Sequence, residues 1–203
     1  MYTSVEQTTR RSQDERRRAT RTAIVAAARQ LFADRGYAGT SLEEVVSLAG
    51  VTRGALYHHY RDKADLLRAV VDSIDAEVLD DVLAAAGPTQ PAVAWIRRAA
   101  LAYVKVSSRL RLSRIGAELP AVLGPEEYRR ISQARCLPIV VAAGRAASEA
   151  GAAIPGDPEI MAALILAALD EAVGHYSVAT TRARREKVLA TTEALITGVL
   201  RID

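Results

Sequence analysis

The sequence contains one cysteine, Cys136, among its 203 residues. A single cysteine cannot form a disulfide within the chain, and it excludes a zinc site built from several cysteines. No uninterrupted apolar run reaches the roughly 18–20 residues that span a bilayer. The N-terminus carries scattered charges and lacks the apolar core of a secretory signal. We therefore expect a cytoplasmic protein with no membrane partner.

Sequence motifs of catalysis are also missing. We find no glycine-rich phosphate loop, no serine nucleophile elbow and no paired metal-binding motif. This pattern predicts neither enzymatic activity nor a cofactor.

Glycine and proline are sparse inside the periodic stretches, where alanine and leucine dominate, and this composition favours helices over sheets. No run of alternating residues demands a strand, and no internal repeat is visible. The sequence therefore predicts an all-α fold of about nine helices. The expected helices span approximately residues 14–35, 41–49, 53–59, 62–87, 90–106, 109–119, 125–151 (kinked at Pro138), 158–180 and 184–200.

Residues 41–60 have the pattern of a helix-turn-helix. Ser41 and Glu44 form a capping box that opens a short helix. Gly50 supplies the left-handed turn, and Thr52 is the expected N-cap of a second short helix. Apolar side chains on both helices can close a small core, so that the first helix braces the second in a DNA major groove.

Positive charge is concentrated in the N-terminal third. Residues 1–68 carry 12 Lys or Arg and 8 Asp or Glu, whereas residues 69–203 carry 15 and 16. Residues 1–13 are polar and aperiodic, which predicts a flexible basic arm suited to a polyanion or simply exposed to solvent.

The second short helix has an outer face of small and polar residues. Arg53 can donate two hydrogen bonds to guanine, and small residues at 54 and 55 allow close approach to the bases. We predict that the bases are read by Thr52, Arg53, Gly54, Ala55, Tyr57 and His58. We predict that phosphates are contacted by Thr40, Ser41, Tyr57, His59 and Lys63.

A set of spaced residues across positions 20–67 resembles the DNA-binding domain of TetR-family regulators. It consists of Gly36-Tyr37-x-x-Thr40-Ser41, Val45, Ala49-Gly50-Val51, Gly54-Ala55-Leu56-Tyr57-His58-His59-Tyr60 and Lys63-x-x-Leu66-Leu67. Val46 departs from the small alanine that is usual at its place.

The resemblance implies a homodimer that binds operator DNA and releases it when a small molecule binds. It implies a helix-turn-helix domain at 14–62, after the arm at 1–13, and a ligand-binding and dimerisation domain at 63–203. The last two helices of such proteins form a four-helix bundle with those of a second copy. We predict a dimer interface at Met161, Leu164, Ile165, Ala168, Leu195 and Val199.

The middle helices are expected to enclose an apolar pocket with a few polar anchors. Candidate pocket residues are Trp95, Tyr103, Arg109, Arg114, Glu118, Tyr128, Arg135 and His175. Arg109, Arg111 and Arg114 suit an anionic ligand, but equally suit packing or solvent. Glu171 and His175, four residues apart, have metal-ligand spacing but are more often a hydrogen-bonded pair.

Two further functions remain open from the sequence. The protein could activate transcription instead of repressing it. It could also be a helical small-molecule-binding or enzymatic domain with an incidental DNA-binding module.

Overall fold

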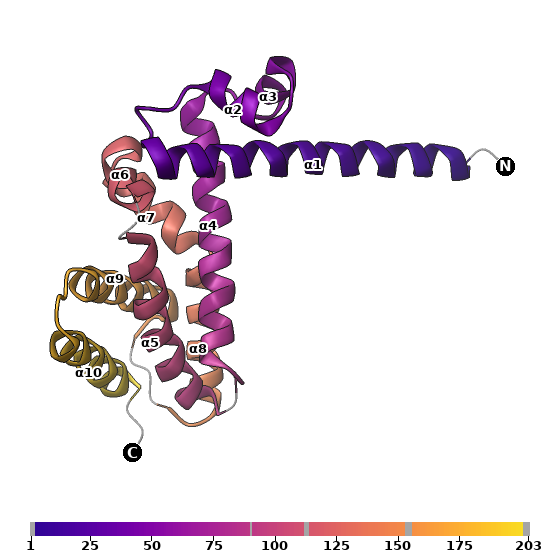
Figure 1. The fold of residues 1–203 in the computed structure, drawn as a ribbon. Coiled ribbons are helices and arrows are strands. Elements are labelled where there is room, and N and C mark those ends of the chain that lie inside the picture. The colour runs from indigo at the N-terminus through magenta and orange to yellow at the C-terminus, as the bar shows by residue number, and fades with distance from the viewer. Residues whose placement is uncertain (1–2, 90, 112–113, 153–155, 201–203) are drawn as a thin grey trace. The chain divides into compact units, whose positions relative to one another are not determined.

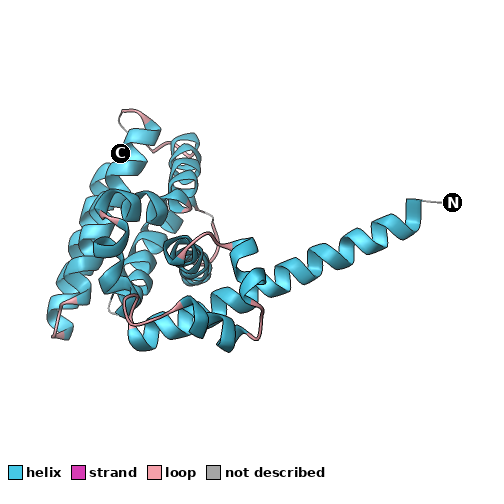
Figure 2. Cartoon of the chain, turned by 90° about the horizontal axis from the view of Figure 1, so that it is seen from above, coloured by secondary structure: helices cyan, strands magenta, loops and turns pink. Residues whose placement is uncertain are grey.

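The computed structural model describes residues 3–89, 91–111, 114–152 and 156–200, without the side chains of 3–12, 110, 111, 114–117 and 132. All regular structure in these ranges is α-helical, which confirms the predicted fold class (Figure 2). The helices, labelled in Figure 1, are α1 (Thr3–Arg35), α2 (Leu42–Ala49), α3 (Arg53–His59), α4 (Lys63–Ala86), α5 (Ala92–Arg111), α6 (Arg114–Leu123), α7 (Pro125–Ala134), α8 (Cys136–Glu149), α9 (Pro158–Ser177) and α10 (Arg182–Val199).

Proline positions explain two differences from the expected helices. The kinked helix expected over 125–151 is divided into α7 and α8 at Arg135. Pro138 has no N–H to donate to the carbonyl of Ala134, and its ring crowds that carbonyl, so α7 ends there. Pro120, expected to stop its helix, lies inside α6, which continues to Leu123.

Helix α1 begins at Thr3, whereas residues 1–13 were expected to form a flexible arm. This stretch contains no glycine or proline, so a helix started in the following residues can propagate through it. Five apolar residues at helical spacing along α1 are all buried: Ile24, Ala27, Ala28, Leu31 and Phe32.

Contacts divide the chain into two compact units, residues 1–73 and 74–203. The first unit contains α1, α2, α3 and the start of α4, and its core includes Val45, Leu56 and Leu66, each fully buried. The range 14–62 predicted for the DNA-binding domain lies inside this unit. The unit also includes residues 63–73, where α4 buries Leu66, Leu67, Val70 and Val71.

Capping interactions fix the short helices of the first unit. The Glu44 N–H donates to Ser41 Oγ at 3.3 Å, and the Ser41 N–H donates to Glu44 Oε2 at 2.9 Å, which confirms the capping box. The Ala55 N–H donates to Thr52 Oγ1 at 3.2 Å, and the Asp65 N–H donates to Asp62 Oδ1 at 2.7 Å. Each helix start was therefore encoded locally by its capping residue.

In the second unit, α5 packs with α8, α9 and α10 around a common core. Fully or nearly fully buried members of this core are Ala100, Val104, Ala147, Ala152, Leu169, Val173, Ile196 and Leu200. The expected start of α9 is confirmed, because Asp157 Oδ1 accepts hydrogen bonds from the Glu159 and Ile160 N–H groups, both at 2.9 Å.

Helix α9 is long and apolar enough to cross a membrane by length and composition alone. Asp170 and Glu171 interrupt its apolar sequence, so it does not contain the uninterrupted apolar run that the sequence analysis required. The same composition is found in core helices of soluble proteins, and α9 packs against α5, α8 and α10. Its apolar residues face two ways, with Leu166 buried and Leu164 61% exposed.

Gly50 provides a test of the helix-turn-helix turn. Its φ of +65° is left-handed, and no atom within 4 Å would meet an added Cβ. We expect Gly50→Ala to lower the free energy of unfolding by about 1–2 kcal/mol through backbone strain alone. Gly54→Ala is the matched control, because its Cβ would meet only Thr52 Oγ1 at 4.0 Å inside a helix. Equal losses of stability in urea denaturation of the two variants would contradict this account of the turn.

Candidate nucleic-acid interface and ligand pocket

Helix α3 packs against the small core of the first unit and leaves one face exposed. Leu56 is fully buried and Tyr60 is 4% exposed, which fixes the inner face. The predicted base-reading residues lie on the outer face or at its edge: Thr52, Arg53, Gly54, Tyr57 and His58 are exposed, and Ala55 is half-buried. The geometry thus leaves these six positions open to a groove, and their contacts with bases stay a prediction.

Arg53 is held only weakly in the free protein. Its Nη2 lies 3.7 Å from Glu43 Oε1, and its guanidinium lies 5.5 Å from the centre of the Tyr57 ring. Both charged side chains are mostly exposed, and such pairs contribute about 0–1 kcal/mol. The guanidinium can therefore exchange Glu43 for a base edge at little cost.

Three predicted phosphate contacts have other roles in the structure. Thr40 is 3% exposed, and its hydroxyl donates to the Gly36 carbonyl at 2.9 Å. The Ser41 hydroxyl donates to Glu44 Oε2 at 2.8 Å within the capping box. Lys63 Nζ donates to the carbonyls of Tyr37 at 2.7 Å and Thr40 at 2.8 Å. In the free protein these polar atoms serve the fold, and the contacts of Thr40, Ser41 and Lys63 with phosphate stay a prediction.

Lys63 joins the start of α4 to the turn between α1 and α2. Besides its two carbonyl hydrogen bonds, the ammonium lies 4.3 Å from the centre of the Tyr37 ring. The first residue of α4 thereby holds the turn between α1 and α2. This role was not predicted from the sequence, although a lysine ammonium is attracted to the face of a tyrosine ring.

A basic hollow lies beside α3 and combines residues from α1, α3 and α4. Its lining residues are Arg17, Arg18, Arg21, His58, His59, Tyr60, Asp65, Arg68, Ala69 and Asp72. Burial lowers the pKa of His59, and the positive charges of His58, Arg17 and Arg21 lower it further. His59 is therefore neutral at neutral pH, and one ring N–H remains able to donate to a phosphate. The three α1 arginines add cationic side chains that were not predicted as site residues.

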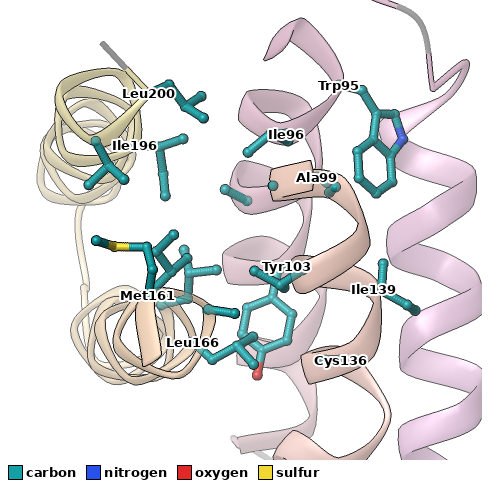
Figure 3. Close-up of a pocket in the computed structure, with 18 of the residues that line it drawn as sticks. Trp95, Ile96, Ala99, Tyr103, Cys136, Ile139, Met161, Leu166, Ile196 and Leu200 are labelled. Atoms are coloured by element: carbon teal, nitrogen blue, oxygen red, sulfur yellow. The ribbon is translucent and has the colours of Figure 1, made fainter. Parts of the chain in front are cut away.

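The second unit encloses a cavity of about 380 Å³ between α4, α5, α8, α9 and α10 (Figure 3). Its walls are mostly aliphatic, with Trp95 and Tyr103 from α5 and Cys136 from α8. The volume lies within the range of about 300–1,000 Å³ typical of small-molecule sites. Two of the predicted pocket residues, Trp95 and Tyr103, thus line this cavity.

The other predicted pocket residues do not line this cavity. Arg109 and Arg135 are exposed, and Glu118 and Tyr128 are half-buried elsewhere. Arg109 follows Tyr103 by six residues, which turns its side chain about 240° around α5 and away from the cavity. The Arg114 side chain lies outside the described residues.

His175 also lies away from the cavity. Its Nε2 is 3.3 Å from Glu171 Oε1, and both side chains are largely exposed on α9. Within the described part of the chain, no group of three possible metal-binding side chains comes together, so the structure supplies no third ligand to this pair.

A carboxylate lies behind the polar end of the cavity. The Tyr103 hydroxyl donates to Asp170 Oδ1 at 2.6 Å. Burial raises the pKa of Tyr103 well above its ordinary value, and the negative charge of Asp170 raises it further. Burial, followed by Asp75 and Asp170, raises the pKa of Cys136 to about 11. The Cys136 thiol is therefore protonated at neutral pH and is a poor nucleophile.

The predicted dimer interface is divided between two faces of α9 and α10. Leu164 is 61% and Leu195 46% exposed, and Ile160, which was not predicted, is 63% exposed. Ala168 and Leu195 line a shallow groove between these helices. Met161, Ile165 and Val199 instead line the cavity. Successive residues of an α-helix are rotated by about 100° around its axis, so the cavity-lining residues and their exposed neighbours face different ways.

Two family models match the chain. One, described as "Bacterial regulatory proteins, tetR family", matches residues 24–70, and one described as "Tetracyclin repressor-like, C-terminal domain" matches residues 93–199. The first covers α2 and α3 with parts of α1 and α4, and the second covers most of the cavity.

Individual relatives agree with these matches. The HTH-type transcriptional regulator TtgR of Pseudomonas putida is 46% identical over 65 residues, which are 32% of this chain and 30% of TtgR. The HTH-type transcriptional repressor BepR of Brucella suis is 46% identical over 52 residues, 26% of this chain and 25% of BepR. The chain thus matches less than a third of the length of these curated relatives.

A solved structure matches almost the whole chain. It is a TetR-family transcriptional regulator from Pectobacterium atrosepticum, with a TM-score of 0.71 and 30% sequence identity. The match covers 93% of this chain and 97% of that one.

Lys63→Met tests whether this residue serves the fold or DNA. Loss of two charge-assisted hydrogen bonds is expected to lower the free energy of unfolding by about 2–3 kcal/mol. Lys105→Met, on an exposed position of α5, is the control and should change stability little. A phosphate role predicts the opposite result: unchanged stability, with the slope of log K against log salt reduced by about 0.9 in DNA titrations.

Proposed function

The chain belongs to the tetR family of bacterial regulatory proteins, and from this premise we propose that it is a homodimeric repressor whose operator is released by a small molecule. It is a DNA-binding transcriptional regulator of a non-enzymatic family. Repression, operator symmetry, dimerisation and ligand release are the proposed parts. Since such a regulator acts on DNA, we propose that it works in the bacterial cytoplasm.

The exposed face of α3 is the observation that carries the DNA-binding part of the proposal. Arg53, Tyr57 and His58 are exposed there, while Leu56 anchors the opposite face. Beside this face, Arg17, Arg18 and Arg21 of α1 supply positive charge for the phosphates. We propose that α3 reads bases and that the arginines, with Tyr57 and His59, contact the backbone.

The exposed apolar residues of α9 and α10 support a dimer. Ile160, Leu164 and Leu195 are each 46–63% exposed, which is costly for a face left in water. A second copy related by a two-fold axis would bury both faces at once. Two copies of α3 would then read a pseudo-palindromic operator, with half-sites separated by about one or two helical turns of DNA.

The cavity supports control by a small molecule. Its size and apolar walls suit a ligand, and Leu79, Val82 and Leu83 of α4 belong to its lining. Helix α4 also begins with Lys63, which holds the turn between α1 and α2. A ligand that favours a different position of α4 would therefore change which conformation the first unit prefers. The printed name of BepR, a repressor, favours repression for this chain.

Selection from a random DNA pool tests DNA recognition. We expect wild-type protein to enrich a pseudo-palindrome at physiological salt. Arg53→Ala should lower affinity for the selected sequence by about 1–3 kcal/mol, with little effect on scrambled DNA. Lys105→Ala serves as the control, since Lys105 is exposed on α5, far along the chain from α3. Failure to enrich any sequence would reject the proposed function.

Leu164→Glu tests the dimer. Because a two-fold axis places the change twice in the interface, we expect the dissociation constant of the dimer to rise more than about a hundredfold. Sedimentation velocity would measure the change. Leu48→Glu, on an exposed position of α2, should leave the dimer intact. A dimer of unchanged affinity in Leu164→Glu would place the interface elsewhere.

A further inference from the structure

A small hollow between α2 and α3 lies beside the residues predicted to read bases. Its lining consists of Leu42, Glu43 and Val46 from α2 and of Arg53 and Tyr57 from α3. Leu42 and Val46 are four positions apart, and so are Arg53 and Tyr57, which places each pair on one face of its helix. The hollow has a volume of about 100 Å³. A water molecule occupies about 30 Å³ in the liquid, so the hollow suits a group of a few atoms.

The walls and the rim of this hollow differ in chemistry. Its walls are the aliphatic side chains of Leu42 and Val46 and the ring of Tyr57. Its rim carries Arg53 and Glu43, whose Nη2 and Oε1 atoms are 3.7 Å apart and whose side chains are mostly exposed. An apolar group inside the hollow would therefore be covered by carbon atoms, while the guanidinium beside it can bond to a base edge.

The major groove of DNA presents one apolar group that distinguishes a base pair, the 5-methyl group of thymine. Arg53, at the rim, has the geometry to donate to O6 and N7 of guanine. Stacked bases are about 3.4 Å apart along a strand, so a thymine in the next base pair brings its methyl group within reach of the same hollow. The hollow is continuous with the exposed face of α3, where Arg53 and Tyr57 lie.

We propose that this hollow binds the 5-methyl group of a thymine in the base pair next to the guanine contacted by Arg53. Leu42 and Val46 then take part in sequence recognition, so α2 reads a base as well as bracing α3. This inference rests on the proposed function for the placement of α3 against base edges, and it adds a second base to the one that Arg53 reads.

Uracil isolates this contact, because it pairs as thymine does and lacks only the methyl group. Arg53→Ala first locates the guanine, as the position of the selected DNA whose sequence preference this variant loses. Each thymine is then replaced by uracil in turn, and fluorescence anisotropy measures the affinity of the wild-type protein. We expect replacement of the thymine next to that guanine to weaken binding about threefold to fivefold per half-site, as for the loss of one buried methyl group.

Val46→Ala removes two methyl groups from the wall of the hollow. It should bring the ratio of thymine to uracil affinity at that position close to one. Leu48→Ala is the matched control, because it also truncates an aliphatic residue of α2, and Leu48 is exposed and outside the lining. It should leave the ratio unchanged. Each variant is compared on two DNAs that differ in one methyl group, so a loss of protein stability affects both affinities equally.

The outcomes separate this inference from the proposed function. Uracil that weakens binding at that position for wild type and Leu48→Ala, but not for Val46→Ala, supports the proposal. Equal affinity for thymine and uracil, which would place the hollow against the sugar-phosphate backbone or in solvent, would overturn it. So would a sensitivity that persists in Val46→Ala, or half-sites without thymine next to that guanine. In all of these cases DNA has been selected and the proposed function stands, whereas a selection that enriches no sequence rejects both.

Discussion

The hydrogen bonds from Lys63 to the carbonyls of Tyr37 and Thr40 are the interaction on which the DNA-binding unit depends. The two carbonyls belong to the turn that separates α1 from α2, and Lys63 is the first residue of α4. The ammonium therefore holds this turn, while the capping box beside it starts α2 in a fixed direction. Because α3 packs against α2, with Val45 and Leu56 both fully buried, the position of the exposed face of α3 depends on how α2 is held.

Helix α9 shows how one sequence serves two apolar environments. Leu166 and Leu169 belong to the interior of the second unit, and Met161 and Ile165 face its cavity. Ile160 and Leu164 remain exposed on a further face. A helix that is apolar nearly all around is costly in water unless each face has a partner. The core, a ligand and a second subunit would together cover the apolar faces of α9, whose composition alone would suit a membrane-spanning helix.

Much of the fold could be predicted from the sequence because its determinants are local. Ser41, Gly50 and Thr52 act within a few residues, and the apolar stripe of α1 follows from helical period alone. The role of Lys63 could not be predicted, since its partners Tyr37 and Thr40 lie 26 and 23 residues away. Composition shows that α9 is apolar without showing which neighbour covers each side, so the sequence could not show that Met161 and Ile165 line the cavity. Arg109 was expected to begin a helix over 109–119, whereas it lies on α5, and only the packing shows which side of α5 faces the cavity.

The central claim is that occupancy of the cavity controls the affinity of α3 for DNA. The most direct measurement first uses the fluorescence of Trp95, which lines the cavity, to find an apolar compound that the protein binds, and then titrates this compound against the complex of the wild-type protein with its selected DNA. Binding of the compound is also measured with and without that DNA. We predict that the saturating compound weakens DNA binding, and that DNA weakens binding of the compound by the same factor, because coupling between two sites is reciprocal. An unchanged DNA affinity at concentrations that saturate the Trp95 response would contradict the claim.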